Sequence, residues 1–398
     1  MEKQSKKEPK RNKFGPGFLV AAAFIGPGTV TSATLAGARF GYALVWVVVV
    51  ATLAAIVLQE MVGRFSLATR LDVGAALVRL TGTRGLKIFF QVLAFLAIVV
   101  GCAAYEAGNI VGGGLGLHIL TGVDVRCWVV AISVIAYLLL LWRNYKWIER
   151  CLIALVVVMG VSFLVSALIV RPDLDGLLRG FIPRIPRGSL LLVLALLGTT
   201  VVPYNLFLHS AAVLKKWRDK GDIPLMRRDA CLSIGLGGVI TLAIVVTAAA
   251  AYFFKGLAIE NPVDLSRQLS PLYGPLARLF FGIGFFAAGL SSAITAPYAA
   301  AWTAAGLFNW KERDWRFSLV FSGVLLFGLF VGLTAIKPLQ LIVLAQVANA
   351  LLLPIVSLFV VYLLNKREVG EFKNTLLQNL LFLLVFLIIL LIHLKYFL

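Results

Sequence analysis

Acidic residues are scarce in this chain. It has 18 Asp and Glu against 37 Lys and Arg, and only 14% of its 398 residues are charged. The acids that fall well inside apolar stretches are Glu60 and Glu106. No nucleophile, base and orienting group occur together along the sequence, so we predict that the protein is not an enzyme.

Cysteine and histidine are also rare. The sequence contains four cysteines and three histidines, and neither set has the close spacing of a zinc site or of a disulfide framework. We therefore expect no bound cofactor and no resident metal. The cysteines are predicted to be small core residues. The residues in question are Cys102, Cys127, Cys151, Cys231, His118, His209 and His393.

Apolar residues dominate what remains. Hydrophobic residues make up 61% of the chain and its mean hydropathy is +0.96, which excludes an ordinary soluble globule. Apolar runs long enough to cross a bilayer as helices recur throughout, without the alternation of barrel strands. We predict an all-α integral membrane protein with eleven transmembrane helices, near residues 16–40, 43–63, 88–119, 126–142, 151–170, 189–212, 230–254, 275–307, 317–336, 338–364 and 374–394.

The basic residues predict the orientation. Lys and Arg are retained on the cytoplasmic side of a membrane, and most of them fall on one side if the N-terminus is cytoplasmic. We predict a basic cytoplasmic tail over residues 1–14 and a single transmembrane transporter domain over residues 15–398. The expected location is the plasma membrane. The net charge of +19 is explained by these loops, so no nucleic-acid partner is expected. The oligomeric state is left open.

Two spans contain helix-breaking sequences at membrane depth. Residues 26–29 read Gly-Pro-Gly-Thr, and residues 202–205 read Val-Pro-Tyr-Asn. Broken helices are tolerated in a bilayer only around a protein-lined cavity, and matching breaks in the two halves of a transporter mark its binding site. Pro27 and Pro203 are the predicted breaks. Neither break carries a carboxylate.

Several blocks of the sequence resemble the Nramp family of proton-coupled divalent metal transporters. They occur in the family's order and extend over nearly the whole chain, at residues 15–28, 36–42, 203–210, 288–295, 344–347 and 353–354. The resemblance implies a LeuT-like fold. In this fold spans 1–5 and 6–10 form inverted repeats, and broken helices 1 and 6 hold the substrate.

The chain departs from the family pattern at the positions that bind metal. The first-span motif of the family is Asp-Pro-Gly-Asn, and this chain has Gly26 and Thr29 in place of the Asp and Asn. The sixth-span motif is Met-Pro-His, and here Val202 and Tyr204 replace the Met and His. The family's third-span aspartate aligns with Ala103.

Removal of the acids leaves the positive N-terminal ends of two half-helices facing the predicted cavity. Our leading expectation is therefore a secondary transporter or uniporter for a small oxyanion, with bicarbonate as the specific candidate. A proton-coupled divalent metal transporter for Mg or Mn is the alternative, and a non-transporting Nramp-like receptor is the second. The predicted substrate-binding residues are Gly26, Gly28, Thr29, Thr200, Val202, Tyr204, Asn205 and Gln346.

Ion coupling is assigned to two titratable residues. An ionisable group inside a membrane is a functional candidate by default. Glu106 lies mid-span, and His209 lies in a block that resembles the family, so both are predicted to form a coupling or proton pathway. A neutral, hydrogen-bonded carboxyl that tightens helix packing is the alternative role for Glu106. Glu60 has Arg64 one helical turn later and is expected to form a structural ion pair.

Overall fold

The computed structural model describes residues 25–142, 146–311 and 314–397, and every regular element in these ranges is helical. The prediction of an all-α protein is confirmed. The predicted basic tail at residues 1–14 and the start of the first span lie outside the described residues. The division into a tail and one transmembrane domain stays a prediction.

The elements follow one another with short connections. The main helices are α2 (Pro27–Phe40), α3 (Val45–Thr69), α5 (Arg84–Thr121), α6 (Val125–Trp142), α7 (Lys146–Ile169), α9 (Leu190–Thr200), α10 (Pro203–Lys216), α11 (Ile223–Ala251), α13 (Ala277–Phe308), α14 (Trp315–Gly332), α15 (Pro338–Leu364) and α16 (Leu376–Phe397). Shorter elements are α4 (Val73–Arg79), α8 (Leu174–Arg179), η1 (Lys220–Asp222), η2 (Phe253–Lys255), η3 (Pro262–Leu269), α12 (Ser270–Tyr273), η4 (Gly274–Leu276) and η5 (Arg367–Phe372).

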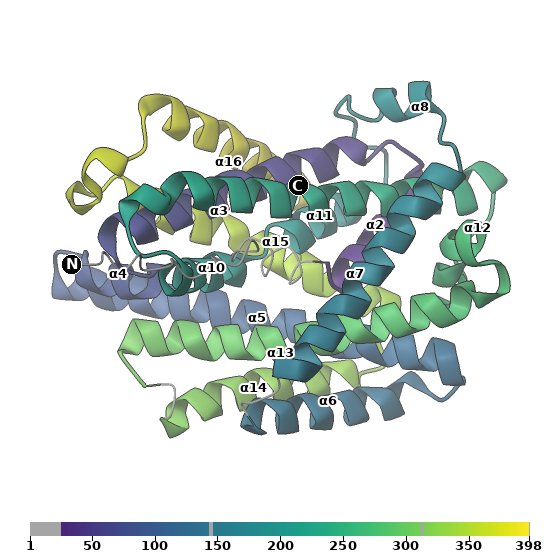
Figure 1. Ribbon diagram of the computed structural model, residues 1–398, viewed down its shortest axis with the longest axis horizontal. Helices are drawn as coiled ribbons and strands as arrows, with labels where there is room; N and C mark the ends of the chain where they lie inside the picture. The colour runs from purple at the N-terminus through teal and green to yellow at the C-terminus, as the bar shows by residue number, and fades with distance from the viewer. Residues whose placement is uncertain (1–24, 143–145, 312–313, 398) are drawn as a thin grey trace, which may run out of the picture.

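The short interrupted helices lie inside a shell of long ones. Figure 1 shows α3, α11 and α16 along one side, α6 and α14 along the other, and α2, α10 and α15 between them. Helix α5 makes its most extensive contacts with α13, α14 and α15, while α2 packs mainly on α11 and α9. The two predicted breaks are therefore enclosed by the molecule.

Nine segments of the described chain are long and apolar enough to cross a membrane. They include the segment Leu190–Lys216, which joins α9 and α10. Two of the eleven predicted spans are not among the nine: the first, of which only α2 is described, and the last, which is α16. The total of eleven spans stays a prediction.

The second predicted break is present in the structure. Helix α9 ends at Thr200 and α10 begins at Pro203, and Val201 and Val202 between them have non-helical backbone angles. Pro203 causes the interruption because it has no N–H to donate and its ring disfavours helix in the residue before it. Helix α2 likewise begins at Pro27, after Gly26 in an extended conformation.

Close backbone packing holds the breaks in place. A Cβ atom on Gly198 would lie 1.9 Å from the backbone oxygen of Gln346, so α9 and α15 touch main chain to main chain. A Cβ on Gly112 of α5 would lie 2.1 Å from Cβ of Pro27. Each interrupted helix is thus positioned by a glycine that allows a close approach.

A charged cluster joins α3 to α11 away from the breaks. The expected pair is present, with Arg64 Nε 2.9 Å from Glu60 Oε1. Arg227 of α11 also reaches Glu60 Oε1, at 2.7 Å. Arg64 is buried and donates a further hydrogen bond to Asn374 Oδ1 at 2.9 Å. The cluster therefore has a structural role that links three parts of the chain.

Replacement of Gly198 by Ala tests the backbone contact between α9 and α15. The added methyl group would meet main-chain atoms that cannot rotate away, so Gly198→Ala should destabilise the protein by about 1–3 kcal/mol. The measurement is the melting temperature of the purified protein in detergent. Gly323→Ala in α14 is the control, because a Cβ there meets nothing within 4 Å. Equal melting temperatures for the two variants would contradict the packing.

Candidate functional site

The first residues of α2 and α10 form the centre of the candidate site. Gly26 and Val202 are the N-cap residues of these helices, and neither makes a side-chain cap. Both helix starts are fully buried. The two broken helices therefore present backbone groups, rather than acidic side chains, at the centre of the molecule.

A direct hydrogen bond connects the two broken helices. Thr29 Oγ1 of α2 lies 2.8 Å from Thr199 Oγ1 of α9, and both side chains are buried. The neighbouring Thr200, a predicted site residue, instead donates its hydroxyl to the carbonyl of Leu196 at 2.9 Å within its own helix. Of the two adjacent threonines, Thr199 makes the contact between helices.

Gln346 of α15 lies against the start of α2. A Cβ atom on Gly28 would come within 2.2 Å of its Nε2 atom and 2.6 Å of its Oε1 atom. Nε2 donates to the carbonyl of Ile342 at 3.3 Å, while Oε1 is buried with no hydrogen-bond partner among the described residues. The structure thus brings together Gly28 and Gln346, as predicted for one site, and leaves an amide oxygen available there.

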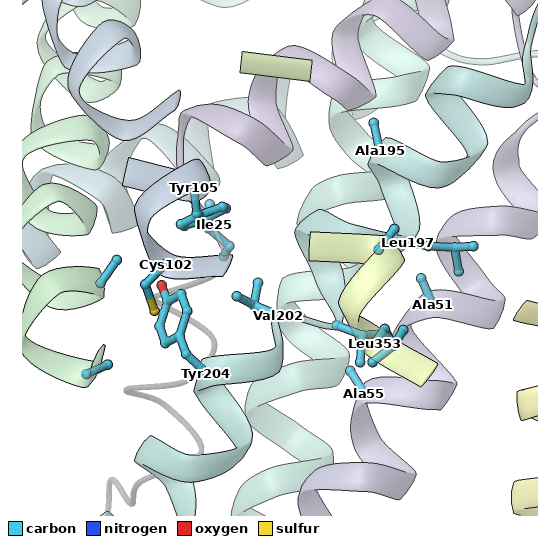
Figure 2. Close-up of a cluster of buried hydrophobic side chains, with 14 of the residues drawn as sticks. Ile25, Ala51, Ala55, Cys102, Tyr105, Ala195, Leu197, Val202, Tyr204 and Leu353 are labelled. Carbon is cyan, nitrogen blue, oxygen red and sulfur yellow. The ribbon is translucent and has the colours of Figure 1, made fainter. Parts of the chain in front are cut away.

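Helix α10 contributes two buried polar side chains. The Tyr204 hydroxyl and both amide atoms of Asn205 are buried without a hydrogen-bond partner in the described ranges. The Tyr204 ring packs edge-on against Tyr105 of α5, with ring centroids 5.8 Å apart. Figure 2 shows the Tyr204 hydroxyl directed toward Cys102, with Val202 close by. Polar groups without partners at the breaks are typical of a ligand site.

The predicted coupling residues lie on different helices. Glu106 of α5 is fully buried, and its Oε2 accepts a hydrogen bond from Asn109 Nδ2 at 3.2 Å, while Oε1 has no partner among the residues described. His209 is buried in α10. Neither of its ring nitrogens has a partner within the described ranges. Both groups are therefore withdrawn from solvent.

Sequence reasoning selected Glu106 on α5 but missed Tyr105 and Asn109 on the same face. Cys102, Tyr105, Glu106 and Asn109 follow the i, i+3, i+4, i+7 spacing of one helical face, and this spacing could have identified them together. Cys102 is buried, whereas Cys127, Cys151 and Cys231 are exposed, so the prediction of core cysteines is right for Cys102 alone. Within the described ranges, no three His, Cys, Asp or Glu side chains come together.

Comparison with known proteins identifies the family. Residues 17–398 match the family described as natural resistance-associated macrophage protein-like. The chain belongs to the Nramp family. It is 32% identical over 380 residues to the divalent metal cation transporter MntH 1 of Pseudomonas aeruginosa, and the match spans 90% of this chain and 85% of that protein. This chain is therefore a multi-pass membrane transporter and not an enzyme, as predicted.

Solved structures confirm the predicted fold of this Nramp protein. A mutant form of the manganese transporter of Eremococcus coleocola superposes with a TM-score of 0.73 at 22% identity, covering 96% of this chain and 85% of the other. MhsT in complex with L-phenylalanine gives a TM-score of 0.60 at 16% identity, over 94% and 98% of the two chains. The architecture is LeuT-like.

The expectation of bicarbonate, or of any small oxyanion, is wrong. The Nramp relatives that match this chain along most of its length are named divalent metal cation transporters. The error was to count only the positive N-terminal ends of the half-helices. Helix α9 ends at Thr200, three residues before Pro203, so its negative carbonyl end meets the same break. Unwound carbonyls and helix C-terminal ends coordinate cations in transporters of this architecture.

A double-mutant cycle tests the bond between Thr29 and Thr199. Thr29→Val, Thr199→Val and the double variant remove the hydroxyls with little change in shape. Because the hydroxyls interact directly, the two losses should be non-additive by about 0.5–1.5 kcal/mol in unfolding free energy. Chemical denaturation in detergent provides the measurement. Additive effects would show that the hydroxyls act independently.

Proposed function

We propose that this Nramp protein transports a divalent metal cation by alternating access, with Mg²⁺ or Mn²⁺ as the substrate. Its relatives are named divalent metal cation transporters. The oxygens at the breaks support a cation that prefers oxygen, since Tyr204 offers a hydroxyl and Asn205 and Gln346 offer amide oxygens. Carbonyl and water oxygens suit Mg²⁺ and Mn²⁺, whereas softer metals prefer sulfur or imidazole.

The absence of a carboxylate from the Gly26–Thr29 and Val202–Asn205 sequences favours a substrate that keeps part of its water shell. Mg²⁺ in particular dehydrates reluctantly and is usually bound with several of its waters. Hydroxyl and amide oxygens can accept hydrogen bonds from those waters. Buried polar atoms of Tyr204, Asn205 and Gln346 lack a hydrogen-bond partner in the described chain. They are suited to bind the waters of the ion, because a buried polar atom needs such a partner.

We further propose that Gly26, Gly28, Thr29, Val202, Tyr204, Asn205 and Gln346 surround the substrate. Gly26, Gly28, Thr29 and Val202 contribute backbone groups, and Tyr204, Asn205 and Gln346 contribute side chains. Thr200 is the weakest member of the predicted set, since its hydroxyl is already bonded within α9. A plasma-membrane location with a cytoplasmic N-terminus accompanies this proposal.

The single observation that carries the proposal is the group of buried oxygens at the breaks that have no partner in the described ranges, in a chain related to metal transporters. The experiment is uptake into proteoliposomes that contain the purified protein and a metal-sensitive fluorophore. Saturable uptake of Mn²⁺ or Mg²⁺ above that of empty liposomes is expected. Lack of uptake of either ion by correctly folded protein would contradict the function and favour a receptor without transport.

Glu106 is proposed to carry the proton that accompanies the metal. Its side chain is buried in α5 against Gly328 of α14, next in sequence to Tyr105, and one of its carboxyl oxygens has no partner in the described chain. Glu106→Gln keeps the shape but cannot exchange a proton. The variant should lose metal-driven proton movement, measured with a pH-sensitive dye inside the liposomes. Glu260→Gln, at an exposed position, is the control. Unchanged proton movement in Glu106→Gln would remove this residue from coupling.

A further inference from the structure

The position occupied by Gly26 is flanked by hydroxyl groups from two other helices. A Cβ atom on Gly26 would lie 3.0 Å from Ser292 Oγ of α13 and 3.6 Å from Tyr105 Oη of α5. Such a side chain would start in tight contact with Ser292. The two hydroxyls therefore occupy the side of the first break toward which a residue 26 side chain would point.

The Tyr105 hydroxyl is the more unusual of the two groups. Tyr105 is fully buried, and its hydroxyl has no hydrogen-bond partner among the described residues. Burying a hydroxyl without a partner costs about 1–3 kcal/mol, so such groups in native proteins call for an explanation. The packing of its ring against Tyr204 fixes the hydroxyl near Gly26.

The surroundings of Tyr105 belong to the substrate site. Figure 2 shows its side chain next to Ile25, immediately before the start of α2. Its ring neighbour, Tyr204, is the second residue of α10. The Tyr105 side chain thus lies between the beginnings of both broken helices, although α5 itself is continuous there.

We propose that Tyr105 and Ser292 form a hydroxyl subsite beside Gly26 that binds the water shell of the transported divalent cation. This inference rests on the proposed function and adds two substrate-binding residues to it. A hydroxyl both donates and accepts, so it can hold a metal-bound water in place without contributing charge. The subsite contacts the substrate where a side chain at position 26 would otherwise contact it. It selects cations that retain water.

Tyr105→Phe is the direct test, because it removes the hydroxyl and keeps the ring. The initial rate of uptake into proteoliposomes is measured over a range of concentrations of Mn²⁺ and of Mg²⁺. The half-saturating concentration of the transported ion should rise by about fivefold or more, which is the loss expected for one hydrogen bond. The maximal rate should change less, since the helices that move are intact. Ser292→Ala should also raise the half-saturating concentration.

Tyr137→Phe is the matched control. Tyr137 is a partly exposed residue of α6 whose ring packs on Phe321, away from the breaks. The half-saturating ion concentration of the Tyr137→Phe variant should therefore equal that of the wild type. Melting temperatures of all variants are compared, because a purely structural role of Tyr105 would lower stability without changing the half-saturating concentration.

The outcomes separate the two proposals. Wild-type uptake with an unchanged half-saturating concentration in Tyr105→Phe overturns the subsite and leaves the metal transport proposal intact. Absence of wild-type uptake of both ions overturns the transport proposal and the subsite together. A half-saturating concentration that rises in Tyr105→Phe but not in Tyr137→Phe supports the subsite.

Discussion

A helix interrupted inside a bilayer leaves N–H and C=O groups that water cannot satisfy, and the rest of this structure depends on how they are accommodated. The interruption between Thr200 and Pro203 is completely buried. Intact helices surround it, and α15 approaches α9 closely enough to touch backbone. The site is therefore a consequence of the interruption: the groups that need partners are the groups that can bind a substrate.

Polar side chains near the breaks fall into two kinds. Some are satisfied by the protein, such as Thr199 with Thr29 and Thr200 within its own helix. Others, including the Tyr105 and Tyr204 hydroxyls, are buried without partners in the described chain. The first kind holds the half-helices together, and the second kind leaves hydrogen-bonding capacity for a ligand. The distinction separates threonines with a structural role, Thr199 and Thr200, from the tyrosines that we propose to bind the substrate.

Local features of the fold could be predicted from the sequence. Pro203 places the second break where it occurs, because the effect of proline on a helix depends on its immediate neighbours. The Glu60–Arg64 pair follows from helical spacing. Helical spacing groups Tyr105 with Glu106, but only tertiary packing brings Tyr105 and Ser292 to Gly26, so their place beside the first break could not be predicted. The predicted charge of the substrate was wrong because the electrostatic field at a break depends on which helix ends, N-terminal or C-terminal, face it.

The contact of Gly198 with the Gln346 carbonyl also bears on movement. No side chain separates α9 from α15 at Gly198, and interiors packed at this density resist small displacements. We expect the two helices to keep this contact during any movement of the protein. In the proposed transport cycle, the non-helical residues Val201 and Val202 would be the joint about which α9 and α10 change their relative angle.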